Sequence, residues 1–204
     1  MALRFLVAVD VEGFSRRPAA EQARVQHVLE RIMTQAAAAA SLDRKRWYRQ
    51  PRGDGELAIL PAGIDGLSLV ADYPRRVAAA LDAVNRAQAG SRLRVRMAIH
   101  HGAVTPGFFF GPVGSGPIVI SRLIDAPILR RQLSQQDHLD IALIVSATVY
   151  QEVIQTRLGD LRPEAFRRII VRTKDVSYVG YLCDDCNLER RQPEPPPPRQ
   201  PLSA

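Results

Sequence analysis

Two aspartates, each beside a glycine in a short turn, are the residues of this chain best placed to do chemistry. Asp10 ends an apolar segment in Val9-Asp10-Val11-Glu12-Gly13, and Asp54 lies in Gly53-Asp54-Gly55-Glu56. Carboxylates buried at strand ends need a compensating charge, and a pair of divalent metal ions carrying phosphate is a common one. Each aspartate also fits an ordinary structural role, Asp10 as a helix N-cap and Asp54 as a turn former. The residues alone leave both interpretations open.

The elements that must position these aspartates follow from hydrophobic periodicity and turn signals. Asp54-Gly55 predicts a tight hairpin, and Pro74 predicts a kink or restart within the second helix. The predicted elements are, in order, strand 3–10, helix 18–40, strands 46–50 and 56–61, helix 67–89 and strand 93–100. This order is the ferredoxin-like βαββαβ unit, in which the first and third strands are neighbours. The sequence therefore predicts an α/β (α+β) fold in which Asp10 and Asp54 meet.

Further elements are predicted after this core. They are a hairpin around Thr105-Pro106-Gly107, a helix over 118–133, a strand over 141–145, a helix capped by Ser146, and strands over 168–172 and 178–182. Residues 1–186 are expected to form one domain. Residues 187–204 include four consecutive prolines and are expected to be a disordered or polyproline tail.

Composition limits the classes of function. The chain has 204 residues, 46% of them hydrophobic, which is enough for one well-filled core. Its net charge of +7 is spread along the chain without a cluster of aromatic residues, so nucleic-acid binding is not expected. No run of 18 apolar residues and no signal peptide is evident, and a cytoplasmic protein without membrane contact is expected. The only cysteines, Cys183 and Cys186, are at most half a zinc site.

Four motifs in order resemble the class III nucleotidyl cyclase catalytic domain over about residues 3–182. They are Asp10-Val-Glu-Gly-Phe-Ser15, Gly53-Asp54-Gly55, Arg96-Met-Ala-Ile-His-His-Gly102 and Gly114-Ser-Gly-Pro-Ile-Val-Ile-Ser-Arg122-Leu123. Each motif is weak by itself, but their order on a ferredoxin-like pattern is specific. Within that family, the chain resembles small, divergent stand-alone bacterial members.

The resemblance implies roles for individual residues. It implies that Asp10 and Asp54 hold two Mg²⁺ or Mn²⁺ ions, and that Arg122 stabilises charge at the reacting phosphorus. The turn after Asp10 is expected to present backbone amides to the phosphates, with a helix N-terminus behind it. The residues assigned to phosphate binding are Glu12, Gly13, Phe14, Ser15 and Lys174. His100 and His101 end a core strand and could bind metal, but they are expected to pack in the core or to support neighbouring site residues instead.

The sequence departs from the family where base and ribose are read. Ile118 stands where the family has an asparagine that positions the ribose, and isoleucine has no hydrogen-bonding side chain. Gln50 and Gly111 stand at the two positions that select the purine. Metal and phosphate handling are thus expected to be kept, while base selectivity is expected to be atypical.

Two functions remain open on this sequence. The first is conversion of a nucleoside triphosphate to a 3′,5′-cyclic nucleotide and pyrophosphate, in a homodimer with shared sites. The second is a catalytically degenerate cyclase domain that binds nucleotide or a partner protein as a regulatory module. Ile118 favours the second, whereas Asp10, Asp54 and Arg122 favour the first. In either case a separately encoded partner is expected to regulate the protein.

Overall fold

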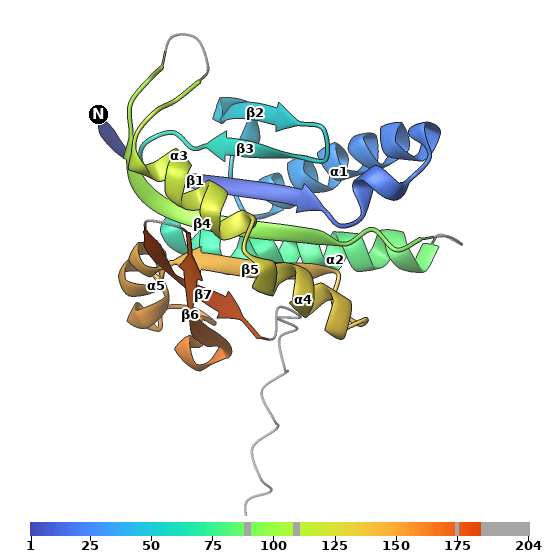
Figure 1. The fold of residues 1–204 in the computed structure, drawn as a ribbon. Coiled ribbons are helices and arrows are strands. Elements are labelled where there is room, and N and C mark those ends of the chain that lie inside the picture. Colours follow the sequence, from blue (N-terminus) through green and yellow to red (C-terminus); the bar gives the residue numbers. More distant parts are fainter. Residues whose placement is uncertain (88–90, 108–110, 174–175, 185–204) are drawn as a thin grey trace, which may run out of the picture.

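A seven-stranded sheet with helices on both faces forms the centre of the protein in a computed structural model (Figure 1). The structure describes residues 1–87, 91–107, 111–173 and 176–184. The strands are β1 (Ala2–Val11), β2 (Tyr48–Arg52), β3 (Gly55–Ile59), β4 (Val95–Val104), β5 (Ile141–Ser146), β6 (Phe166–Arg172) and β7 (Ser177–Cys183). Their order in the sheet is β2-β3-β1-β4-β5-β7-β6. The part β2-β3-β1-β4 is the ferredoxin-like arrangement that the sequence predicts.

The helices divide between the two faces, as Figure 1 shows, with α1 and α2 behind the sheet and α3 and α4 in front. They are α1 (Ala19–Ala39), α2 (Tyr73–Ala87), α3 (Ser115–Ile124), α4 (Pro127–Gln135) and α5 (Ala147–Glu152). Alternating side chains of β1 follow this division: Val7 and Val9 belong to the core with α1 and α2, and Leu6 and Ala8 to the core with α3. By the same alternation Asp10 belongs to the α3 side of the sheet.

One predicted helix is divided in the structure, and the predicted irregularity of another is observed. The predicted helix over 118–133 is two helices, because Ala126 before Pro127 is extended (φ −59°, ψ 126°), as a residue before proline prefers. The expected restart near Pro74 is confirmed: a π-helical turn over Ser68–Asp72 leads into α2, where Pro74 is the second residue. The chain after Asp10 forms only a 3₁₀ turn, Phe14–Arg16, before α1 begins at Ala19.

The C-terminal elements agree with the prediction. Ser146 caps α5, since its hydroxyl accepts a hydrogen bond from the Val149 amide at 3.3 Å. Thr105 and Val113 exchange two backbone hydrogen bonds, as the predicted hairpin requires, and its tip lies outside the described residues. Cys183 is buried, whereas Cys186 and the proline-rich tail also lie outside them. Among the helices described, none is both long and apolar enough to cross a membrane.

Candidate functional site

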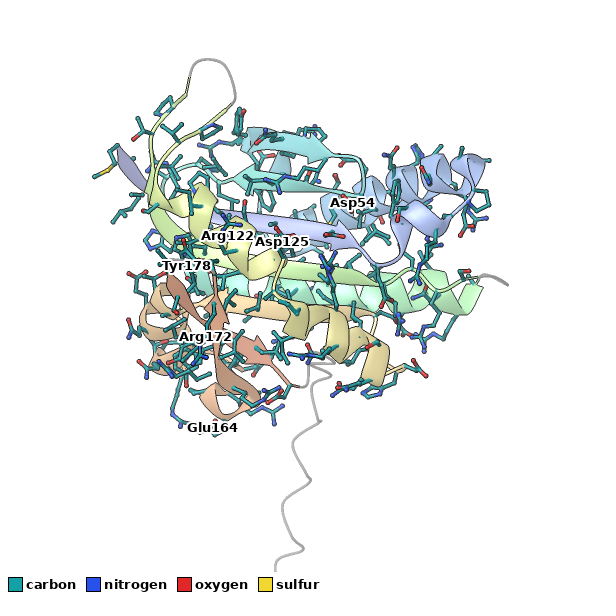
Figure 2. The ribbon with its side chains drawn as sticks, viewed as in Figure 1. Asp54, Arg122, Asp125, Glu164, Arg172 and Tyr178 are labelled. Atoms are coloured by element: carbon teal, nitrogen blue, oxygen red, sulfur yellow. The ribbon has the colours of Figure 1, made fainter. Side chains whose placement is uncertain are left out.

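Strand register brings the two aspartates together at one end of the sheet. Asp10 on β1 is the Cα partner of Gly55 on β3, and the Val11 amide donates a hydrogen bond to the Asp54 carbonyl at 2.8 Å. The approach is so close that a Cβ atom on Gly55 would lie 1.8 Å from the Val9 carbonyl oxygen, so only glycine fits there. Figure 2 shows Asp54 at the hairpin end beside β1.

An arginine on the neighbouring strand partly neutralises Asp10. Arg96 on β4 is the register partner of Asp10, and its Nη2 donates to Asp10 Oδ2 at 2.5 Å. Burial raises the pKa of Asp10; the hydrogen bond and charge of Arg96 oppose this rise, and the charges of Asp54 and Asp125 add to it. Asp10 thus lies in a partly buried acidic environment that one guanidinium only partly compensates.

Unsatisfied atoms on both members of this ion pair indicate a missing ligand. Asp10 Oδ1 is buried and has no hydrogen-bond partner among the described residues, and the same is true of Arg96 Nε and Nη1. A free carboxylate oxygen fits a cation, and free guanidinium N–H groups fit an anion. Asp54 and Asp125 add negative charge, although the described residues contain no group of three or more acidic, histidine or cysteine side chains arranged to hold a metal. The residues present therefore fit a metal ion that arrives with its own anionic ligand.

The turn after Asp10 has the open backbone expected of a phosphate loop. Gly13 has a φ of 65°, in the left-handed region, and a Cβ atom on it would lie 3.0 Å from the Arg16 guanidinium. The Glu12 side chain forms an ion pair with Arg94 at 2.6 Å, and Ser15 is exposed. Phe14 instead packs against the core of α1 and α2. Gly13 is thus the predicted member best placed to approach an anion.

A small cavity beside this turn is strongly basic. Its volume is about 310 Å³, and it is lined by Glu12, Gly13, Arg16, Arg96, Arg130, Arg131 and Ser134. Four arginines face one glutamate, and that glutamate is already paired with Arg94. Arginine donors in this number favour a phosphate or pyrophosphate group. The cavity shares Arg96 with the aspartate site, so an anion here and a cation at Asp10 would be neighbours.

Arg96, Asp125 and the pair Arg130 and Arg131 belong to the site but were not among the residues predicted for it. Arg96 belongs to the motif that spans residues 96–102. Alternation along this strand places it on the same face as His100, and this could have indicated that it faces the site. No comparable signal existed for Arg130 and Arg131, because the prediction of one continuous helix hid the break at Pro127 that fixes how α4 lies.

The two predicted base-reading positions lie side by side. A Cβ atom on Gly111 would be 3.5 Å from Gln50 Oε1 and 3.4 Å from the Tyr48 hydroxyl. Ile118 lies on α3 with 52% of its surface exposed, which is unusual for isoleucine. Gln50 and the neighbouring Tyr48 offer an amide and a hydroxyl, whereas Gly111 and Ile118 offer no polar side-chain group.

Arg122 is exposed on α3, where Figure 2 shows it one turn from Asp125. Across the described ranges its guanidinium makes no hydrogen bond or ion pair. The charged groups that act most on Asp10 are Arg96, Asp54 and Asp125. One chain therefore leaves Arg122 free for a ligand or a second chain. Lys174 lies outside the described residues.

The two adjacent histidines on β4 are packing residues, as predicted. His100 is buried, and burial together with the neighbouring His101 lowers its pKa to about 4. His101 stacks on Phe5 with ring centroids 4.5 Å apart and contacts Glu152 at 2.7 Å.

Solved structures similar to this chain are nucleotidyl cyclases. The adenylate/guanylate cyclase/hydrolase from Silicibacter pomeroyi is 19% identical, covers 89% of this chain and 95% of its own, and has a TM-score of 0.61. The guanylyl cyclase Cya2 is 17% identical, with 89% and 91% covered and a TM-score of 0.62. The adenylyl cyclase CyaB from P. aeruginosa is 16% identical, with 89% and 94% covered and a TM-score of 0.57.

This chain has the nucleotidyl cyclase fold. The sequence matches no family model, and no curated protein matches it either. At these identities the likeness to the solved cyclases shows the fold alone, so the chemistry depends on the residues described above.

Proposed function

We propose that this protein binds a metal–nucleoside triphosphate and converts it to a 3′,5′-cyclic nucleotide and pyrophosphate. The observation that carries the proposal is the Asp10–Arg96 pair beside an arginine-lined cavity, in which a buried carboxylate oxygen and two buried guanidinium nitrogens have no partner among the described residues. A metal ion with an attached phosphate supplies both missing charges at once. The likeness in fold to solved nucleotidyl cyclases is consistent with this reaction.

The proposed reaction needs one bond formed and one broken. The ribose 3′ oxygen attacks the α-phosphorus, its proton passes to water, and the bond between the α-phosphorus and the bridging oxygen breaks to release pyrophosphate. Asp10 and Asp54 would hold Mg²⁺ or Mn²⁺, which when bound polarises the attacking hydroxyl and the phosphates. Gly13, Arg16 and Arg96 would bind the phosphates that leave.

We further propose that the working unit is a homodimer with shared sites. Arg122 is exposed and unpaired among the described residues, so in a single chain it has no ligand to stabilise. Apolar side chains at the base-reading region are also exposed, 49% for Tyr48, 56% for Val113 and 52% for Ile118. A second copy would cover them and bring its own Arg122 to the aspartates of the first.

A specific observation also favours a second candidate, a degenerate cyclase domain that acts as a nucleotide-binding regulatory module. Ile118 offers the ribose no hydrogen bond, and Gln50 and Gly111 offer the base no charge. In this case the metal and phosphate sites still bind nucleotide, but the ribose is not held for attack.

Incubation of the purified protein with Mn²⁺ and each of ATP, GTP, CTP and UTP, followed by mass spectrometry, tests the proposal. We expect a cyclic nucleotide and pyrophosphate from the wild type and from Asp82→Ala, since Asp82 is a carboxylate of α2 that pairs with Arg86 on the same helix. Asp54→Ala should give none. Nucleotide binding without any product would favour the regulatory module, and loss of both would contradict each candidate.

A further inference from the structure

A second cavity lies on the opposite face of the sheet from the Asp10 carboxylate. Its volume is about 580 Å³, within the range of small-molecule sites, and it opens between α1 and the β2–β3 hairpin. Its apolar wall includes Val9 and Val11, whose side chains alternate with Asp10 along β1, and also Leu29, Met33 and Trp47. The cavity is therefore separate from the arginine-lined cavity beside Gly13.

The polar wall of this cavity contains a buried arginine that is only partly satisfied. Arg44 is 5% exposed and donates to Glu56 at 2.7 Å and to Glu30 at 2.9 Å. Arg49 also reaches Glu30, at 2.8 Å. Burial raises the pKa of Glu56; at Glu30, burial acts in the same direction, but hydrogen bonds and charge from Arg49 and Arg44 outweigh it and lower the pKa.

Two buried donors on this wall have no acceptor. Arg44 Nε and Trp47 Nε1 are buried, and neither has a hydrogen-bond partner within the described part of the chain. Both residues line the cavity. Buried N–H groups without acceptors are rare in folded proteins because they cost free energy. A ligand with acceptor atoms in this cavity would give them partners.

The rim of the cavity carries positive charge that could pair with an anionic ligand. Lys45 and Arg52 are exposed there, and neither forms an ion pair with a described residue. Glu30 and Glu56 are already engaged by Arg44 and Arg49, and Asp54 at the hairpin tip is the remaining carboxylate of the lining. A ligand that matches the whole surface has an apolar body, acceptor oxygens and a negative charge.

We infer that this cavity binds a small carboxylate with an apolar body, and that its occupancy controls the position of Asp54. The control of Asp54 depends on the proposed function of that residue, whereas carboxylate binding in the cavity does not. Gln26 on α1 donates from Nε2 to the Gly53 carbonyl at 2.6 Å, and both residues line the cavity. The hairpin tip that closes the cavity therefore also carries the second aspartate.

Octanoate is the probe for binding, with octylamine and octanol as controls of equal chain length. Trp47 is the only tryptophan of the chain, so intrinsic fluorescence reports the cavity directly. We expect a saturable change in emission with octanoate and none with octylamine. No saturable change with octanoate, or an equal change with octylamine, would overturn the inference.

A matched pair of charge reversals locates the site. Lys45 lines the cavity, while Arg46 is its exposed neighbour and does not. Lys45→Glu should weaken octanoate binding about fivefold, the effect of a surface ion pair lost and a repulsion gained. Arg46→Glu should change it less than about twofold, because the same charge change lies outside the cavity. Equal effects of the two variants would place octanoate elsewhere.

The control of Asp54 is tested by titrating Mn²⁺ with and without octanoate. Octanoate should shift the Mn²⁺ midpoint of the wild type and of Gln22→Ala, a glutamine of α1 whose side chain bonds the Arg17 carbonyl instead. Gln26→Ala should bind octanoate but lose the shift. Octanoate binding without any shift would overturn the control of Asp54. If Mn²⁺ does not bind at all, the proposed function fails, and Trp47 fluorescence still decides whether the cavity binds carboxylates.

Discussion

Removing the Asp10 carboxylate should destabilise the fold, whereas removing that of Asp54 should not. Asp10→Ala leaves the Arg96 guanidinium, whose side chain is only 9% exposed, without the one acidic partner it has in the described part of the chain. Breaking a buried ion pair costs about 3 to 5 kcal/mol. We expect the lower end, about 3 kcal/mol, because Asp54 and Asp125 already disfavour the charge on Asp10. Asp54 makes no side-chain hydrogen bond among the described residues, so its loss should cost about 0.5 kcal/mol or less.

Thermal unfolding with and without Mn²⁺ separates the two variants. For a domain of this size about 1 kcal/mol corresponds to ~2 to 4 °C, so Asp10→Ala should lower Tm by ~6 to 12 °C. Asp54→Ala should lower it by ~2 °C or less. Mn²⁺ at a hundredfold excess over its Kd should raise the wild-type Tm by ~5 to 11 °C, since such binding stabilises by about 2.7 kcal/mol. Neither variant should show that increase.

A double variant tests the physical reason. Asp10→Ala combined with Arg96→Met removes both charges, and replacing both partners of a buried pair with apolar groups is close to neutral. The double variant should therefore regain at least half of the lost Tm. If Asp10→Ala melts within ~2 °C of the wild type, or if the double variant is no better than the single one, Arg96 does not depend on Asp10 and the reasoning is wrong.

Three further predictions concern the ribose position, the dimer and acid stability. Ile118→Asn should raise turnover of the triphosphate by at least ~10-fold in the mass-spectrometric assay, because one transition-state hydrogen bond is worth more than ~1.4 kcal/mol; unchanged turnover with nucleotide bound contradicts catalysis. Mixing Asp54→Ala with Arg122→Ala chains should restore one working site per heterodimer, and a mixture as inactive as its parents argues against shared sites. The pKa of His100 is about 4 when folded and 6.5 when unfolded, so the unfolded chain binds the proton first as pH falls. Stability should be full above pH 6.5 and should fall by ~3 kcal/mol between pH 6.5 and 4 in urea titrations, and His100→Gln should remove most of this fall.

Local signals in the sequence were enough to predict the core fold and the meeting of the two aspartates. The Asp54-Gly55 turn and the alternation in β1 and β4 depend only on neighbouring residues. The order of the elements then selects the ferredoxin-like arrangement, which places β3 beside β1. Gln50 and Gly111 lie side by side in the structure, and their role in base reading stays a prediction.

The charge balance of the site could not be predicted in the same way. Sequence spacing treats Asp10 and Asp54 as equivalent, but packing buries one with Arg96 and leaves the other at a hairpin tip. The helix break before Pro127 decides where Arg130 and Arg131 lie, and the predicted continuous helix missed it.

The sequence by itself determined which residue types occur at strand ends and turns, because backbone hydrogen bonding and side-chain alternation act over a few residues. Only the tertiary structure decided which of those groups are buried from solvent and which buried groups have no hydrogen-bond partner among the described residues. Desolvation of Asp10, Arg96, Arg44 and Trp47 depends on strands and helices that are far apart in the chain. The arginine-lined cavity and the cavity under the β2–β3 hairpin are likewise formed by segments that are far apart in the chain.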